Sequence, residues 1–331
     1  MKILYAIQGT GNGHLARATE IIPYLQEIGQ IDLLVSGIQG DISLPFEVKY
    51  KLYGFSFIFG KKGGVDIWKT IAKIRLFRLI KDIRKIPVND YHLVINDFEP
   101  VTAWACKLRK KTCIGLSHQN AVLHAKAARP TKKDIPGTFI LKHYAPSKIR
   151  YGFHFKQLDG QNFTPVIRSS IRKAMVTNKG HYTVYLPAFS DVEIEKILSG
   201  HKNVRWEVFS KHCRESYSTG SIQFNPVSLD GFNRSFVSCA GILCTAGFET
   251  PAEALYMGKK LCVIPMKNQY EQACNAAMLV EMGIPVIDKM SNCRHILTNW
   301  LAQNQTVKIT YADNTKCIIA ELIDSYACAT K

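Results

Sequence analysis

The chain has 331 residues, of which 47% are hydrophobic and 21% charged, so it can bury a globular core, and its length favours two domains. Its 43 lysines and arginines against 26 acids give a formal net charge of +17, which predicts polyanionic partners: nucleic acid, an anionic membrane face or phosphorylated substrates. No apolar run approaches the roughly 18 residues that span a bilayer, and no cleavable signal pattern precedes Gly9, so we expect a cytoplasmic protein.

The first residues predict the opening of a parallel α/β domain. We expect a strand from Lys2 to Ile7, a glycine loop at Gly9-Thr10-Gly11-Asn12-Gly13, a helix from His14 to Ile28 and a strand from Ile31 to Val35. Glycines let a ligand approach the backbone, and a helix N-terminus favours anions, so a phosphate or pyrophosphate is the expected guest. The spacing matches neither the dinucleotide fingerprint nor a P-loop. A tight turn with no ligand is the alternative.

His14 and Asp97 are the candidate catalytic residues. His14 begins the first helix, whose positive end should keep the imidazole neutral, as a general base requires. Asp97 follows an expected strand from Tyr91 to Asn96, at the carboxyl edge of the sheet where open α/β folds bind ligands. We expect Asp97 to orient His14 or to act as the base itself. A helix N-cap ahead of Pro100 is the alternative for Asp97, and Glu99 is a weaker candidate.

The segment from Gly60 to Ile86 predicts a helix with one apolar and one basic face. Apolar side chains recur at helical spacing among many lysines and arginines, and Phe57 and Phe59 precede them. This pattern is typical of a helix that lies on an anionic membrane surface. An amphipathic helix packed on the sheet is the alternative.

A proline-containing segment from Asn162 to Arg168 indicates the connection between two domains. Before it we expect a helix from Val101 to Leu108 and strands from Thr112 to Leu116 and from Tyr151 to Phe155. The expected units are 1–164, 165–309 and a C-terminal helix in 310–331 that packs back on the first domain. In the second half we expect helices at Asp191–Leu198 and Phe232–Ser238, and strands at His181–Leu186, Val204–Phe209, Ile242–Cys244, Leu261–Ile264 and Ile284–Ile287.

The densest motif follows the strand that ends near Thr245. Gly247 makes a turn, and the amides of Phe248, Glu249 and Thr250 open a helix that can hold a diphosphate. The carboxylate of Glu253, on the first turns of that helix, suits the two hydroxyls of a ribose. The loop after Pro265 is rich in amide and acid groups that suit sugar hydroxyls.

These residues resemble the donor-site signature of inverting GT-B glycosyltransferases, which include the bacterial lipid-intermediate N-acetylglucosaminyltransferase and macrolide and plant glucosyltransferases. The signature reads Thr-Ala-Gly-x-x-Thr-x-x-Glu-Ala-x-x-x-Gly-(x)6-Pro-(x)3-Gln-x-x-Gln-x-x-Asn-Ala from Thr245 to Ala276. The loop Gly9 to His14 and the segment Leu116 to Val122 are similar to two loops of the peptidoglycan enzyme. An uncharacterised bacterial and archaeal branch of these transferases looks closest.

The resemblance implies an α/β GT-B fold, in which two Rossmann-like domains face each other across a cleft. The donor domain, 165–309, would hold a diphosphate at Gly247 to Thr250 and a ribose at Glu253. Phe248 and Glu249 stand where smaller residues are common in that family. Facing the transferred sugar would be Glu271, Gln272 and Asn275, and facing the acceptor, in domain 1–164, would be Gly11, Asn12, Gly13 and His118.

The expected reaction moves a sugar from a nucleotide-diphosphate donor, a UDP-sugar by analogy with relatives, to a hydroxyl acceptor. Several relatives use lipid-linked acceptors, which agrees with a peripheral position on the inner face of the membrane. No Asp-x-Asp occurs, so we expect no metal and no cofactor, with Ser210 and Lys211 as candidates to assist the leaving diphosphate; a solvated surface lysine is the alternative for Lys211.

Two other functions stay open at this point. A UDP-sugar 2-epimerase or hydrolase of the same fold would use the acids of the cleft and need no acceptor. The net charge could instead mark a non-catalytic nucleic-acid-binding protein, which is disfavoured because the chain carries no zinc module and no RNA-recognition signature.

Overall fold

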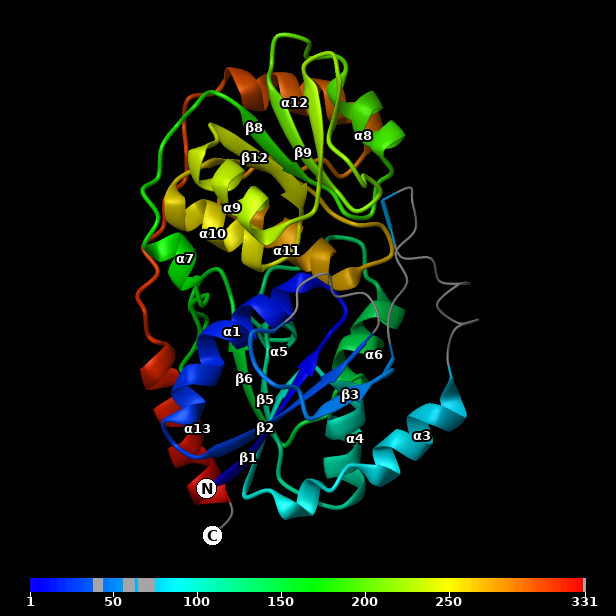
Figure 1. Ribbon diagram of the computed structural model, residues 1–331, viewed down its shortest axis with the longest axis vertical. Coiled ribbons are helices and arrows are strands. Elements are labelled where there is room, and N and C mark those ends of the chain that lie inside the picture. The colour runs from blue at the N-terminus through cyan, green and yellow to red at the C-terminus, as the bar shows by residue number, and fades with distance from the viewer. Residues whose placement is uncertain (38–43, 56–62, 65–74, 330–331) are drawn as a thin grey trace.

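Two α/β halves, one above the other, make up the molecule (Figure 1). The computed structural model describes residues 1–37, 44–55, 63–64 and 75–329. Within these ranges the first half holds a seven-stranded parallel sheet in the order β3-β2-β1-β4-β5-β6-β7. Its strands are β1 (Lys2–Gln8), β2 (Gln30–Ser36), β3 (Tyr50–Leu52), β4 (Leu93–Asp97), β5 (Ile114–Leu116), β6 (Ile149–Phe153) and β7 (Asn162–Phe163).

Helices cover this first sheet, so its central strands are buried on both faces. Residues 3–7 of β1 and 93–97 of β4 are all buried, which explains why both strands read as continuous apolar runs in the sequence. The helices are α1 (Asn12–Gln26), α3 (Leu76–Lys85), α4 (Pro100–Leu108), α5 (His118–Val122) and α6 (Ile135–His143), with a short 3-10 turn at Val88–Asp90.

The second half holds a six-stranded sheet in the order β10-β11-β9-β8-β12-β13, counted within the described ranges, and only β10 runs antiparallel to its neighbour. Its strands are β8 (Tyr182–Tyr185), β9 (Trp206–Ser210), β10 (Tyr217–Thr219), β11 (Ile222–Pro226), β12 (Gly241–Thr245) and β13 (Lys260–Ile264). Its helices are α7 (Ser169–Arg172), α8 (Asp191–Leu198), α9 (Leu229–Ser238), α10 (Glu249–Met257), α11 (Tyr270–Glu281) and α12 (Cys293–Ala302), with a 3-10 turn at Met290–Asn292.

The predicted helices and strands of the described residues are present with shifted ends, except for one strand. Ile284 to Ile287 forms no strand, because only Val286 bridges to Val263 of β13. Of the predicted segment from Gly60 to Ile86, residues 60–62 and 65–74 lie outside the described residues, and α3 occupies its end. Among the described residues, none of the helices has the length and apolar character that crossing a membrane requires.

In each sheet, the first strand has later strands on both of its sides, so the direction in which strands are added reverses there. The chain adds β2 to one side of β1 and β4 to the other, and in the second sheet it adds β9 to one side of β8 and β12 to the other. Ligands of open α/β sheets bind beyond the carboxyl ends of the strands at such a reversal. The loop after β1 and the loop after β12 are the two predicted glycine motifs, and both lie at a reversal.

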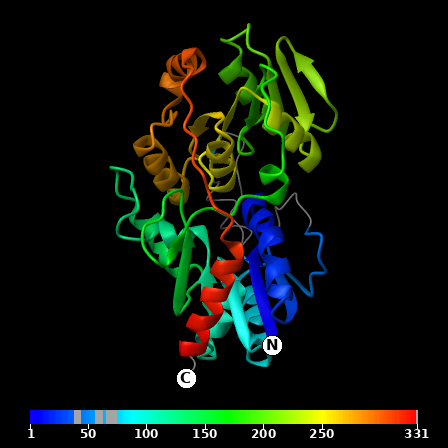
Figure 2. The same ribbon diagram turned by 90° about the vertical axis from the view of Figure 1, so that its left-hand side faces the viewer.

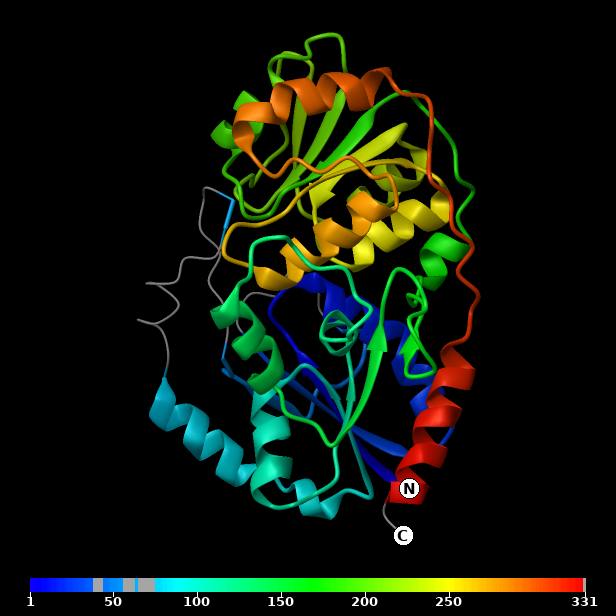
Figure 3. The same ribbon diagram turned by 180° about the vertical axis from the view of Figure 1, so that it is seen from behind.

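The chain passes between the halves twice, along one side of the molecule (Figure 3). Arg172 joins the two passages, because its guanidinium donates to the carbonyls of Tyr311 (2.8 Å) and Ala312 (3.1 Å). The last helix, α13 (Thr315–Ala329), then returns to the first half and lies along α1 (Figure 2). The C-terminal helix therefore begins later than the Thr310 expected from the sequence.

We expect Leu322→Ala to lower the free energy of unfolding by about 2 to 4 kcal/mol, because Leu322 is fully buried where α13 meets the first half, and its truncation leaves a cavity. Chemical denaturation measures the loss. The neighbouring exposed residue gives a matched control, since Glu321→Ala should change the stability little. Equal stability of the two variants would mean that α13 does not contribute to the fold.

Candidate active site

A cavity of about 190 Å³ opens between the two halves, where the predicted loops meet. Its walls come from the loop after β1, the start of α5, the loop after β12 and the N-terminus of α11. Predicted site residues that line it are Gly11, Asn12, Gly13, His14, His118, Gly247, Phe248, Glu249, Thr250, Glu271 and Gln272. Lys211 lines it as well, whereas Asp97, Ser210, Glu253 and Asn275 do not.

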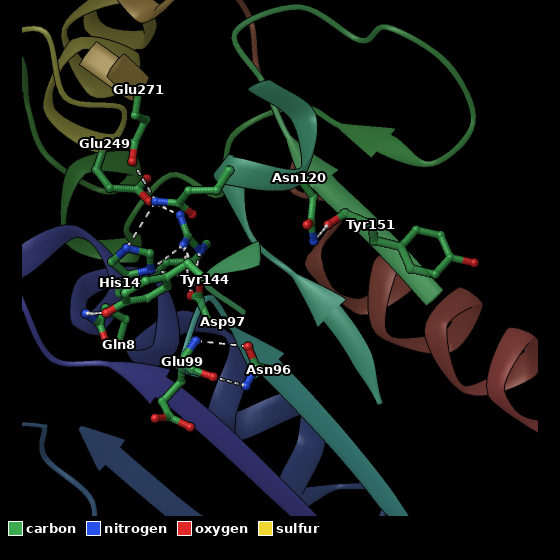
Figure 4. Close-up of polar contacts among 12 residues, drawn as sticks. Gln8, His14, Asn96, Asp97, Glu99, Asn120, Tyr144, Tyr151, Glu249 and Glu271 are labelled. Atoms are coloured by element: carbon green, nitrogen blue, oxygen red, sulfur yellow. Dashed lines mark hydrogen bonds and ion pairs between the residues drawn. The ribbon is translucent and has the colours of Figure 1, made fainter. Parts of the chain in front are cut away.

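His14 and Asp97 lie in direct contact, as Figure 4 shows. The Nδ1 atom of His14 is 2.8 Å from Oδ1 of Asp97, and the His14 ring reaches the cavity while Asp97 is fully buried behind it. When Nδ1 donates to Asp97, the Nε2 atom keeps its lone pair and faces Gln119, whose Nε2 is 3.3 Å away. This geometry gives His14 the arrangement of a general base.

Arg17 lies three residues after His14 on the same face of α1 and contacts both His14 and Asp97. Its guanidinium donates to both carboxylate oxygens of Asp97, at 2.7 Å to Oδ1 and 2.8 Å to Oδ2, and it lies 3.1 Å from Nδ1 of His14. Burial would raise the pKa of Asp97, but the charges of Arg17 and His14 outweigh it and hold that pKa below its usual value. Asp97 is therefore an ionised, fully occupied carboxylate.

The structure assigns the cap of α4 to Glu99 and not to Asp97. The Glu99 carboxylate accepts hydrogen bonds from the amides of Val101 (2.7 Å) and Thr102 (2.6 Å) and from the hydroxyl of Ser36 (2.6 Å). The capping alternative for Asp97 is thus wrong. Glu99 is fully buried and lines none of the cavities around His14, so it does not belong with the acids of the cleft.

Glu249, at the N-terminus of α10, reaches across the cleft to Arg17 and accepts a hydrogen bond from Nη1. Burial raises the pKa of Glu249 to about 7, although the Arg17 charge opposes the rise. Arg17 is not among the residues predicted from the sequence. Its only local signal is the spacing of three residues from His14, which puts both side chains on one helix face.

His118 and Phe248 form a second contact between the halves. Their rings are stacked with centroids 3.9 Å apart and planes at 7°. Burial lowers the pKa of His118 to about 4, so the imidazole is neutral. Its Nε2 atom lies 2.7 Å from Oδ1 of Asn275, whose amide nitrogen donates to the carbonyl of Ala246. Asn275 therefore links His118 to the loop after β12, and both polar atoms of its amide have a partner.

Gln119 links His14 to the predicted sugar site. Besides facing His14, its Nε2 donates to Oε2 of Glu271 at 2.8 Å, and burial raises the pKa of Glu271. A second cavity of about 110 Å³ adjoins His14 and Glu271 on this side. Its apolar wall comes from Phe98, Ile140, Leu141, Tyr144 and Tyr270. His14 thus lies between the two cavities and lines both of them.

Glu253 is paired with Arg168, which is not among the residues predicted from the sequence. Nε and Nη2 of Arg168 each donate to one oxygen of the carboxylate at 2.6 Å. Both residues line a third cavity, of about 80 Å³, which shares Thr250 and Glu249 with the first. Ser210 is buried and donates to Asp191, so it lies outside these cavities. Among the described residues, no group of three His, Cys, Asp or Glu side chains could hold a metal ion.

Comparisons with known proteins agree with this architecture. A family model described as glycosyl transferase family 1 matches residues 1–303. A search of curated proteins found no match. Among solved structures, the glycotransferase of kitacinnamycin has a TM-score of 0.59 at 11% identity over 99% of this chain and 95% of its own.

Two further solved structures have the same fold. MurG of Acinetobacter baumannii has a TM-score of 0.53 at 13% identity over 98% of this chain and 99% of its own. A UDP-glucosyltransferase from Polygonum tinctorium has a TM-score of 0.57 at 13% identity over 98% of both chains. The prediction of two Rossmann-like halves around a cleft is confirmed.

We expect Glu249→Gln to change how stability depends on pH. The pKa of Glu249 is raised, so the folded protein binds a proton that the unfolded chain has lost, and the stability that this group contributes falls as pH rises from about 4.5 to 7. The stability of the variant relative to that of the wild type should therefore rise with pH across this range, by at most about 3 kcal/mol. Denaturation at several pH values, with the exposed Glu281→Gln as control, measures it. Parallel curves for wild type and Glu249→Gln would contradict the burial argument.

Proposed function

The chain belongs to glycosyl transferase family 1, and we propose that it transfers a sugar from a nucleotide-diphosphate donor to a hydroxyl acceptor with inversion at the anomeric carbon. The donor is a UDP-sugar in this proposal. One observation carries it: the amides at the start of α10 and the ring of His14 line the same cavity from opposite halves. A leaving group and a base can therefore act on one carbon from two sides.

In the proposed reaction, the acceptor hydroxyl attacks the anomeric carbon and gives its proton to Nε2 of His14. The bond from that carbon to the diphosphate oxygen breaks, and the nucleoside diphosphate leaves with the electron pair. The amides of Gly247 to Thr250 and the positive end of α10 stabilise the charge that develops on it. No metal ion takes part in this proposal.

Asp97 is the orienting residue and His14 the base. Both oxygens of Asp97 already accept from Arg17, its pKa is lowered, and its side chain is fully buried. A buried, ionised and saturated carboxylate is a poor acceptor for a substrate proton. The same carboxylate holds the Nδ1–H of His14 and so directs Nε2 toward the cavity.

The cavities suggest which part of each substrate lies where. The third cavity, with Glu253, Tyr185 and Phe232 in its wall, suits the nucleoside of the donor. Each oxygen of Glu253 accepts one hydrogen bond from Arg168 and keeps an acceptor position for a ribose hydroxyl. The second cavity has one apolar wall and polar side chains opposite it, which suits an acceptor with a hydrophobic group next to its reactive hydroxyl, as in a lipid-linked acceptor.

We expect calorimetric titration with UDP, UDP-glucose, UDP-N-acetylglucosamine, dTDP and GDP to show selective binding of one nucleotide. His14→Ala should retain that binding and lower the rate of sugar transfer by about 10²- to 10⁴-fold, because only the base is removed. Glu253→Ala should weaken the binding itself. If the wild type bound no nucleotide, the proposal would fail; release of a free or epimerised sugar without any acceptor would instead indicate a hydrolase or epimerase.

We further propose that α3 contacts an anionic membrane surface. Phe77 is 90% exposed and Leu76 57%, and no residue of this helix is buried. Basic side chains occur throughout the same helix, at Arg78, Lys81, Arg84 and Lys85. An exposed helix with apolar and basic side chains suits the interface of an anionic bilayer.

The double variant Arg78→Ala and Lys81→Ala should bind vesicles that contain phosphatidylserine about 10- to 30-fold more weakly, since each cation near such a surface contributes about 1 kcal/mol. Co-sedimentation at low and high salt measures this. Val192→Ser removes an exposed apolar side chain from the second half and serves as the control. Equal binding of the double variant and the wild type would rule out α3 as the contact.

A further inference from the structure

The donor loop, Gly247 to Thr250, is docked onto the first half through two of its own side chains. Phe248 stacks on His118, and Glu249 accepts a hydrogen bond from Arg17. The Glu249 side chain also lies directly on Gly13, because a Cβ added to that glycine would be 3.0 Å from its Cγ. The loop that is to hold the donor is thus attached to the loop that carries His14.

All three nitrogens of the Arg17 guanidinium donate to carboxylates of the protein. Nε and Nη2 donate to Asp97, Nη1 donates to Glu249, and the side chain is only 2% exposed. Burial alone would lower the pKa of Arg17, but the charges of Asp97 and Glu249 outweigh it and raise that pKa. Arg17 is therefore a permanently charged bridge between two carboxylates of different halves.

A continuous line of contacts runs from the donor loop to the proposed base. Glu249 accepts from Arg17, Arg17 donates to Asp97, and Asp97 holds Nδ1 of His14 at 2.8 Å. Every member of this line is at most 15% exposed in its side chain. Short hydrogen bonds in a water-poor environment transmit position well, because side chains packed this closely have few alternative arrangements.

We propose that Glu249 is a positioning residue: through Arg17 it holds the donor loop against the acceptor half, so that the distance between His14 and the sugar of the donor is set before the reaction. This rests on the proposed function. Glu249 does not transfer a proton in this scheme. Its carboxylate is the anchor, because it accepts the hydrogen bond from Arg17. The cost is a buried acid close to the proposed site of a diphosphate.

The first test uses no substrate. Glu249→Gln keeps the size of the side chain and removes its charge, so the ion pair with Arg17 is lost while the fold is retained. Amide hydrogen exchange at residues 246–250 of the ligand-free protein should become faster in this variant and stay at the wild-type rate in Glu281→Gln, which changes an exposed acid at the end of α11. Unchanged exchange in Glu249→Gln would overturn the proposal.

The second test separates positioning from binding. In Glu249→Gln the dissociation constant of UDP should stay within about threefold of the wild type, while the rate of UDP release from the UDP-sugar that binds should fall about 10- to 100-fold, the usual effect of a small misplacement. Weaker UDP binding with an unchanged rate would overturn the proposal. If the wild type bound no nucleotide, the proposed function would fail, and the exchange experiment would still decide whether the loop is held by Glu249.

The third test asks whether Arg17 and Glu249 act as one link. Adding Glu249→Gln to Arg17→Lys should lower the rate little beyond the effect of Arg17→Lys alone, because the shared contact is already damaged. Losses that multiply would mean that the two residues act independently, which contradicts the proposed line of contacts.

Discussion

The guanidinium of Arg17 lies between a carboxylate of each half of the molecule, Asp97 on β4 and Glu249 on α10. A buried cation without partners would be very costly, and so would a buried carboxylate, so removing Arg17 would leave Asp97 without its main counter-charge in the interior. Lysine would not replace Arg17, because an ammonium cannot donate from two nitrogens to both oxygens of Asp97 while a third nitrogen reaches Glu249. The orientation of His14 and the position of the donor loop both depend on this one side chain.

This arrangement is possible because two open sheets present equivalent edges to each other. In each sheet the strand order reverses at the first strand, so a crevice forms beyond the carboxyl ends of β1 and β12. A helix N-terminus begins at each crevice, and the two positive helix ends face the same cavity. The topology alone therefore creates an environment that attracts a diphosphate. The side chains around the cavity then determine which reaction can take place there.

The same cluster carries a cost in stability. Glu249 is buried enough for its pKa to rise to about 7, and a smaller neutral residue at this position would avoid that penalty. Phe248, the other large residue of the loop, stacks on a neutral His118 and so adds a contact without a charge. The family resemblance leads one to expect small residues at both positions. Phe248 and Glu249 are larger, and both use their side chains to contact the first half.

The sequence by itself determined the features that depend on residues close together in the chain, which are the strands, the helices and the glycine loops. Apolar runs predicted the buried parallel strands, and glycines between a strand and a helix predicted both crevices, because a close backbone approach needs residues without a side chain. Only the tertiary structure decided the partners. Arg17 meets Glu249 across 232 positions and Arg168 meets Glu253 across 85, and no local pattern records such pairs. Glu99 and not Asp97 caps α4, and Ile284 to Ile287 forms no strand. Both outcomes have the same cause: which hydrogen-bonding groups a residue meets depends on contacts far along the chain.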